Sequence, residues 1–272
     1  MQNVERLALV LLALIPLCQS QTKSYSPEQD GTLAATPQTE SADAETLYER
    51  GRFAREGHRY SQALKWYRLS AAQDFSGAQV DLGFMYFKGL GVEKDPALAA
   101  YWYGLAAAKG DSGGEFGLGL CYQLGEGVEK SPSVAVKWFS LAFSHGDAWA
   151  PNSTGEVQEL DNKDNVQAFH WYRKGAELGD ELAQYNVCRF TVQAIGTSTN
   201  FSEALEWCSK AANKGGSWGQ YGLGRIYEDG TGSRRITRKP LGSTSSLPSR
   251  AIQLRNSGSA CSIRTATASS SI

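Results

Sequence analysis

Residues 82–96 read LGFMYFKGLGVEKDP, and residues 118–132 read LGLCYQLGEGVEKSP. The two stretches share a leucine–glycine pair, a tyrosine, two glycines, the string VEK and a proline, and each shared position recurs 36 residues further on. Self-similarity at a fixed period of this size is the signature of a repeat architecture. The sequence therefore predicts a tandem array of short structural units.

A series of tryptophans extends the repeat in both directions. The intervals are 36, 36, 33 and 36 residues, and the members are Trp66, Trp102, Trp138, Trp171 and Trp207. A further repeat keeps several positions of the pattern and then stops, namely Leu223-Gly224, Tyr227, Gly230 and Gly232. Because the tryptophans share one repeat position, we interpret them as packing residues between helices and not as ligand contacts.

Each repeat reads as a pair of helices. Leu82 and Tyr86, and then Ala99, Trp102 and Ala106, lie three or four residues apart, which places each set on one face of a helix. A hairpin of this kind buries its apolar face only by stacking on its neighbours. We therefore expect an all-α solenoid of stacked helical hairpins, wound as a right-handed superhelix.

The segment between the two helices carries stop and start signals. Gly89 and Gly91 permit the positive φ that ends a helix and closes a tight connection. Asp95-Pro96 then provides an N-cap and a first-turn proline for the second helix. Many of the 29 glycines fall at such joints or between hairpins, which helps to explain their number in a helical protein.

The Leu-Gly-x-x-Tyr, Gly-x-Gly-Val, Trp-Tyr and Ala-Ala-x-x-Gly patterns at this spacing resemble the Sel-one-like repeat, a relative of the tetratricopeptide repeat. The resemblance covers about residues 43–232 and implies a scaffold used in protein–protein interaction. On this register we expect repeats at 43–77, 78–111, 112–147, 148–180 and 181–216, with a truncated one at 217–232.

Two repeats depart from the pattern. Gly51 lies only 12 residues before Ala63, against 16 between Gly83 and Ala99, so the first connection is short. The fourth repeat lacks three residues and carries Pro151 where its first helix should run. We expect that helix to be distorted or shortened.

The N-terminus has the pattern of an export signal. Residues 7–17 form an apolar run, too short to span a bilayer, and Cys18 and Ser20 fit a cleavage site after Ser20. A retained helix and a lipoprotein acylated on Cys18 are the alternatives. Residues 21–42 are expected to be a disordered linker, and the product to be periplasmic or secreted.

The repeat pattern does not continue into the C-terminal tail. Residues 233–272 hold seven basic and no acidic side chains and 11 serines, which leaves 20 basic against 28 acidic residues in 1–232. A reading frame displaced by one base can encode about nineteen residues that continue the repeat in register. We interpret this disordered, basic, Ser-rich tail as out of frame; a basic arm for nucleic acid or anionic lipid is the alternative.

The sequence contains few of the residue patterns that are typical of catalytic or metal-binding sites. His58, His145 and His170 fall in different repeats, without the partner spacing of a zinc site. Gly-x-Gly-Val follows a helix instead of a strand, which removes the basis of a dinucleotide loop. We expect no enzyme, no cofactor, no metal, no transmembrane span, no nucleic acid and no small-molecule substrate. The alternative is β-lactam binding or hydrolysis, which the resemblance implies for cysteine-rich relatives.

Cys188 and Cys208 occupy the positions that Gly83 and Tyr103 hold in an earlier repeat. These positions face each other across a hairpin, so a disulfide is possible in an oxidising compartment. The sequence leaves open whether it forms. Cys121 is expected to be a small buried residue.

The first helix of each repeat should line the concave face of the array, where a protein or peptide partner would bind. The candidate contact residues lie around the Leu-Gly and Tyr positions of successive repeats: Val80, Phe84, Phe87, Lys88, Phe116, Leu120, Gln123, Leu124, Tyr185, Arg189, Tyr221 and Arg225. Aromatic anchors and guanidinium groups suit an extended or helical peptide. Alternatively, Phe84 and Phe116 only fill the seam between repeats.

Overall fold

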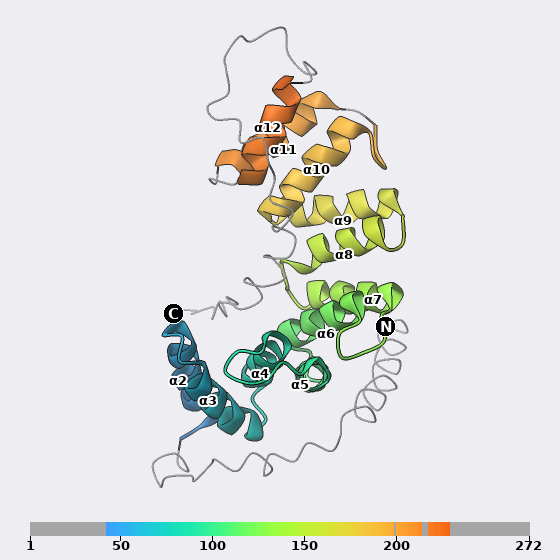
Figure 1. The fold of residues 1–272 in the computed structure, drawn as a ribbon. Helices are drawn as coiled ribbons and strands as arrows, with labels where there is room; N and C mark the ends of the chain where they lie inside the picture. The colour runs from blue at the N-terminus through green and yellow to red at the C-terminus, as the bar shows by residue number, and fades with distance from the viewer. Residues whose placement is uncertain (1–41, 199, 214–216, 229–272) are drawn as a thin grey trace, which may run out of the picture. The chain divides into compact units, whose positions relative to one another are not determined.

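A computed structural model describes residues 42–198, 200–213 and 217–228. The predicted signal peptide, residues 21–41 of the linker and the tail at 233–272 lie outside these residues. The described parts of the chain contain helices and no strand. The helices are α2 (Ala44–Glu56), α3 (Tyr60–Ala72), α4 (Ser76–Lys88), α5 (Pro96–Ala107), α6 (Ser112–Leu124), α7 (Pro132–Ser144), α8 (Ala150–Leu160), α9 (Asn165–Glu177), α10 (Glu181–Gln193), α11 (Phe201–Asn213) and α12 (Ser217–Glu228) (Figure 1).

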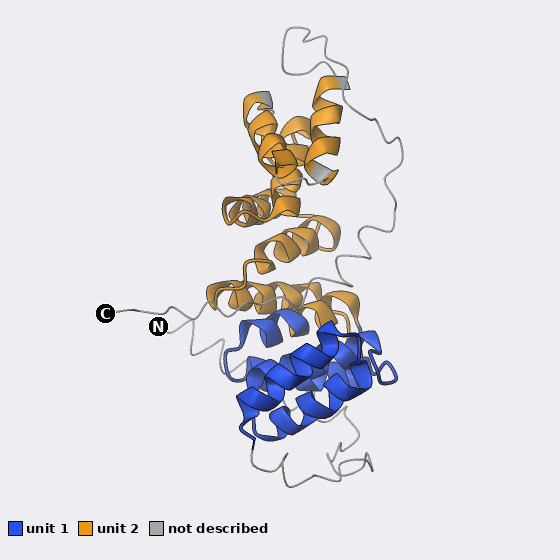
Figure 2. Ribbon diagram, turned by 90° about the vertical axis from the view of Figure 1, so that its left-hand side faces the viewer, with its two compact units in different colours: residues 1–117, 126–128, 246–272 blue, residues 118–125, 129–245 orange. Residues whose placement is uncertain are grey.

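The chain divides into two compact units, and the boundary between them falls within α6 (Figure 2). In unit 1, α2 pairs with α3, α3 contacts α4, and α4 pairs with α5. In unit 2, contacts run in the same way from α7 through α8, α9, α10 and α11 to α12. Within each unit, successive hairpins therefore pack on each other, which confirms the predicted architecture of stacked helical hairpins.

The connections follow the predicted signals. Gly89 ends α4 with φ 71°, and Gly91 has φ 70°. A Cβ on Gly91 would lie 2.7 Å from the carbonyl carbon of Tyr60, so this loop touches the start of α3 in the preceding hairpin. The Asp95 carboxylate accepts a hydrogen bond from the backbone N–H of Leu98 at 3.0 Å, with Pro96 in the first turn.

A second set of caps lies between hairpins. The carboxylate of Asp147 accepts hydrogen bonds from the backbone N–H groups of Trp149 and Ala150, both at 2.8 Å. Asp111 and Asp180 serve the starts of α6 and α10 in the same manner. The recurring Gly-Asp pair thus combines a helix stop with the cap of the next helix, a role that sequence reasoning did not assign to the aspartate.

The structure of the fourth hairpin shows which part of this repeat is three residues shorter than in the other repeats. Its connection, residues 161–164, has four residues, whereas residues 89–95 and 125–131 have seven each. Helix α8 has 11 residues, against 13 in α4 and α6, so the shortening predicted around Pro151 is confirmed. Pro151 lies in the first turn of α8, where its missing N–H breaks no intrahelical hydrogen bond.

The tryptophans of the repeat differ in burial. Trp102 and Trp138 are buried, with 7% and 2% of their surface exposed. Trp66, Trp171 and Trp207 are half-buried. Lysine ammonium groups lie over two of the half-buried rings, 4.2 Å from the centroid of Trp171 and 4.1 Å from that of Trp207. All five still sit on the second helix of a hairpin.

Candidate protein-binding surface

The predicted surface divides into a buried part and an accessible part. Val80, Phe84, Phe87 and Leu120 have only 9%, 8%, 6% and 7% of their surface exposed. At these positions the burial favours packing between helices, the alternative noted for Phe84. Few apolar atoms of these side chains are available to a partner.

Another group of the predicted residues lies at the edge of this packing. Lys88, Phe116 and Gln123 are half-buried, and Leu124 is 40% exposed. The Nζ atom of Lys88 lies 5.1 Å from the ring centroid of Phe87, and burial lowers the pKa of this lysine. The cation therefore covers the ring and keeps it from solvent.

The accessible part of the surface lies on α10 and α12. These two helices are the first helices of successive repeats, and they contact each other in unit 2. Tyr185 and Tyr221 occupy the same repeat position, and their ring centroids lie 6.3 Å apart at an interplanar angle of 58°. Tyr221 is 36% exposed, Tyr185 is half-buried with a pKa raised by burial, and Arg225 is exposed one turn further along α12. The repeat thus builds a two-ring platform.

Arg189, one of the predicted contact residues, forms an ion pair within unit 2. Its guanidinium binds both carboxylate oxygens of Glu159 on α8, at 2.9 and 2.7 Å. The hydroxyl of Tyr172 donates to the same carboxylate at 2.8 Å. The guanidinium is therefore engaged within unit 2, where it joins the fourth hairpin to the fifth.

The Glu159 carboxylate depends on these partners. Burial alone would raise its pKa, but the hydrogen bonds from Arg189 and Tyr172 outweigh burial and hold the pKa below its usual value. Burial and the charge of Glu159 raise the pKa of Tyr172. The sequence offered no signal for this network, because its members come from three helices and lie 13 and 30 residues apart.

The two cysteines considered from the sequence are joined in the structure. Cys188 of α10 and Cys208 of α11 form a disulfide with their Cα atoms 5.6 Å apart. Both sulfurs are buried in a cluster with Ala204 and Ile226. Leu223 of α12 packs against this cluster, so the last helix covers the disulfide. Cys121 is buried and lies outside this disulfide.

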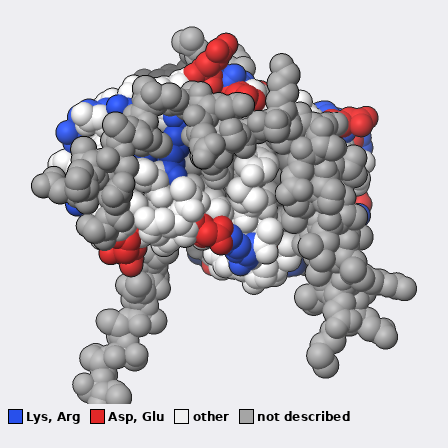
Figure 3. Space-filling model, turned by 90° about the horizontal axis from the view of Figure 1, so that it is seen from below, with Lys and Arg blue, Asp and Glu red and all other residues white. Residues whose placement is uncertain are grey.

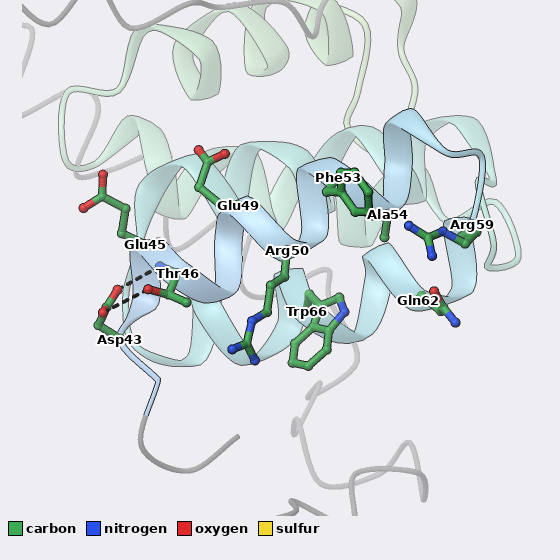
Figure 4. Close-up of a pocket in the computed structure, with 10 residues that line it drawn as sticks. All are labelled: Asp43, Glu45, Thr46, Glu49, Arg50, Phe53, Ala54, Arg59, Gln62 and Trp66. Atoms are coloured by element: carbon green, nitrogen blue, oxygen red, sulfur yellow. Dashed lines mark hydrogen bonds between the residues drawn. The ribbon is translucent and has the colours of Figure 1, made fainter. Parts of the chain in front are cut away.

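A pocket of about 730 Å³ lies on the first hairpin, between α2 and α3 (Figure 4). Two aromatic rings line it, Phe53 and Trp66, and an arginine lies over each ring. The guanidinium of Arg50 is 5.2 Å from the Trp66 centroid, and that of Arg59 is 5.2 Å from the Phe53 centroid. No residue of this pocket is among the predicted binding residues, and Trp66 is predicted from the sequence as a packing residue.

Charge distribution, metal-ligand clustering and helix length complete the description of the surface. On the face shown in Figure 3, the visible lysines and arginines lie in small groups beside aspartates and glutamates. Among the described residues, no group of three or more His, Cys, Asp or Glu side chains is placed to hold a metal ion. None of the helices in the described ranges is long and apolar enough to cross a membrane.

Paired helices that stack repeat upon repeat define a helical repeat protein of the tetratricopeptide-like kind. The Sel1 repeat model matches six segments that together cover more than half of the chain: residues 46–75, 76–111, 112–147, 160–180, 182–216 and 219–235. The chain therefore belongs to the Sel1 repeat family. The first twelve residues of the irregular fourth repeat, 148–159, lie outside the matched segments.

Two solved structures are similar in sequence and fold. One is a protective antigen of uropathogenic Escherichia coli strains that displays an SLR fold, with 32% identity, a TM-score of 0.62 and 71% of this chain covered. This chain spans 43% of that antigen, less than half of its length. The other is a Sel1 repeat protein from Oxalobacter formigenes, with 31% identity, a TM-score of 0.65, and 76% of this chain and 85% of that one covered. No curated protein matches.

Proposed function

We propose that this protein is an exported, non-catalytic repeat scaffold that binds a protein or peptide partner on the first helices of its repeats. The observation that carries the proposal is the platform formed by Tyr185 and Tyr221, whose rings lie 6.3 Å apart on neighbouring first helices. Tyrosine rings anchor partners at low entropic cost and are enriched at the centres of interfaces. Family membership supports an interaction scaffold in general.

The platform suits an extended or helical segment. Its apolar ring faces would hold a side chain of the partner, and the exposed guanidinium of Arg225 would bind a carboxylate or a main-chain oxygen. Arg189 does not bind the partner in this proposal, because Glu159 occupies its guanidinium. Arg189 instead holds α10 against α8 and so sets the position of Tyr185.

The export step rests on the N-terminal sequence. The apolar run at residues 7–17 and the small residues Cys18 and Ser20 support secretion with cleavage after Ser20. Sequencing of the mature N-terminus tests it: we expect Gln21, whereas Met1 on protein kept in the cytoplasm would refute export.

The enzymatic alternative is β-lactam binding or hydrolysis. The structure contains one disulfide among its described residues, in the fifth hairpin, whereas the resemblance to cysteine-rich relatives would imply a pair in nearly every repeat. We expect no turnover of nitrocefin by the purified protein. Turnover above the rate of a heat-denatured sample would favour the alternative.

Photocrosslinking on α12 tests the binding surface. A crosslinking amino acid at position 221 should capture a partner from the envelope fraction of the exporting host, and the same group at position 227 serves as the control. Tyr227 lies on the same helix and is 48% exposed, so the two positions differ mainly in the face they occupy. The variant Tyr185→Ala/Tyr221→Ala should lose capture with an unchanged melting temperature; equal capture at both positions would refute the platform.

A further inference from the structure

The first hairpin has one face that no described hairpin covers. Helix α4 packs on one side of α2, where Arg55 forms an ion pair with Asp81 at 3.4 Å and Tyr48 contacts Phe75 with ring centroids 5.1 Å apart. The helical period places Phe53 on the opposite side of α2. Phe53 is 69% exposed and lines the pocket of Figure 4.

In the second hairpin, the equivalent positions are part of the core. When Gly51 is aligned with Gly83, Phe53 corresponds to Met85, which has no exposed surface. Trp66 likewise corresponds to Trp102, which is buried, although Trp66 itself is only half-buried. The pocket therefore lies where the second hairpin has core positions.

Polar side chains have replaced part of this face. Arg50 stands at the position of the buried Leu82, and Gln62 at the position of the buried Leu98. Terminal repeats of solenoids carry such polar outer faces because a fully apolar face would aggregate. Phe53 and Trp66 nevertheless keep aromatic rings on this face, and Phe53 is 69% exposed.

The two ends of this face carry opposite charges. Glu45 and Glu49 lie at the beginning of α2, Arg50 directly follows Glu49, and Arg59 follows the end of the helix, about 15 to 20 Å from the two glutamates at 1.5 Å per residue (Figure 4). A partner with a single sign of charge would match only one end of the face. A second copy, turned by a two-fold axis, matches both ends.

We propose that this face, defined by Glu45, Arg50, Phe53, Arg59 and Trp66, binds the same face of a second copy of the chain. In a two-fold arrangement, the acidic beginning of each α2 lies opposite the arginine end of the other, and the aromatic rings meet near the axis. Each Glu45 then faces an Arg59 of the other copy. The proposal is independent of the partner-binding function assigned to α10 and α12.

The size of the face sets the strength of the association. Ten residues line the pocket, fewer than the roughly 20 to 30 per side of a standard stable interface. We therefore expect a reversible dimer with a dissociation constant in the micromolar range.

Sedimentation equilibrium of the natural chain tests the proposal, with circular dichroism as the check on folding. The wild-type chain should pass from monomer to dimer as its concentration rises through the micromolar range. Phe53→Ser should weaken the dimer at least tenfold. Glu45→Arg and Arg59→Glu should each do the same, because each places like charges opposite one another twice.

A charge exchange makes the test specific. The double variant Glu45→Arg/Arg59→Glu should regain the wild-type dissociation constant, and an equimolar mixture of the two single variants should form a heterodimer tighter than either homodimer. Glu206→Arg on α11, with the same charge change at an exposed site, should leave association unchanged.

Three results would overturn the proposal. The first is a monomer at every concentration. The second is a dimer whose dissociation constant does not change in the charge-reversal variants. The third is a dimer that forms only after residues 21–41 are deleted, which would assign the face to that segment. Partner binding at the tyrosine platform is read in a separate experiment, so either proposal can fail alone.

Discussion

Gly83 lies directly beneath the ring of Tyr103, so close that a Cβ on the glycine would be 2.7 Å from ring carbon Cδ1. The same arrangement joins the two helices of other hairpins, in the pairs Gly51–Tyr67, Gly119–Phe139 and Gly155–Tyr172. In the fifth hairpin, the disulfide between Cys188 and Cys208 occupies this place. A glycine under an aromatic ring and a disulfide are therefore two solutions to the same close approach of helices.

This contact predicts opposite effects for two alanine substitutions in one hairpin. Gly83→Ala should force the ring of Tyr103 from its position and destabilise the protein by about 1 to 3 kcal/mol, the usual cost of overpacking. Gly104→Ala is the matched control, since a Cβ at Gly104 in α5 meets no atom within 4 Å. It should stabilise the helix by about 0.5 to 1 kcal/mol. Urea unfolding measures both, and equal effects would contradict the packing.

Two tryptophans at one repeat position predict a second contrast. Trp102→Ala removes a buried side chain and should cost about 3 to 5 kcal/mol. Trp66→Ala should cost less, because Trp66 is half-buried at the open face of the first hairpin. Thermal melts at a concentration below that of any dimer give the comparison. Equal losses of stability would mean that the contribution of each tryptophan depends on its repeat position alone and not on whether a preceding hairpin covers it.

The hairpins and their connections could be predicted from the sequence because they depend on local physics. Glycine with positive φ at Gly89 and Gly91, the Asp95 cap and the apolar spacing each act within a few residues, and the 36-residue period repeats the signal. The period also located the irregular fourth repeat. Its loss of three residues proved to lie in the loop before α9, which spacing within the sequence could have shown.

The binding surface could be predicted only in part, because exposure depends on neighbouring helices. Phe84 and Tyr221 were assigned to the same stripe, yet Phe84 is 8% exposed and Tyr221 is 36% exposed. The sequence predicts Arg189 as a partner contact. In the structure, its guanidinium donates hydrogen bonds to the carboxylate of Glu159, which lies 30 residues earlier in the chain. Polar Arg50, standing where Leu82 stands in the next repeat, was the available signal for the open face of the first hairpin.

The out-of-frame interpretation of residues 233–272 predicts that their removal leaves the melting temperature and the helix content unchanged. Restoring the displaced frame should add a second helix beside α12 and stabilise the fifth hairpin and α12. The gene's DNA sequence is the direct check. The interpretation would be refuted by a genomic sequence that does not encode the repeat-like residues in the displaced reading frame.

Removing the disulfide should destabilise the end of unit 2. A cross-link that closes a loop of about 20 residues contributes roughly 3 kcal/mol in the chain-entropy view. Cys188→Ala/Cys208→Ala should lose about that amount, and a reducing agent should lower the stability of the wild-type chain but not of the variant. Hydrogen exchange should place the loss in α10, α11 and α12. Cys121→Ala is the control, since Cys121 is not part of the Cys188–Cys208 disulfide, and the sensitivity of this variant to reductant should match that of the wild type.

The network around Glu159 predicts how stability depends on pH. Because the folded protein holds the pKa of Glu159 below its usual value, the unfolded chain binds the proton more readily than the folded one. The stabilisation is therefore complete above the ordinary pKa of a glutamate, about 4.3, and is lost as the pH falls below it.

Glu159→Gln isolates this contribution. A hydrogen-bonded, partly buried ion pair of this kind contributes about 1 to 3 kcal/mol, so the variant should be less stable than the wild type by that amount at pH 7. The difference should shrink as the pH falls below about 4.3, because the unfolded chain then binds the proton more readily than the folded one. Glu206→Gln, which removes the exposed i,i+4 pair with Lys210, should change stability by less than about 0.5 kcal/mol at either pH. Urea unfolding of the three proteins across this range gives the values. A difference between wild type and Glu159→Gln that stayed constant with pH would show that the Glu159 charge does not stabilise the contact between α8 and α10.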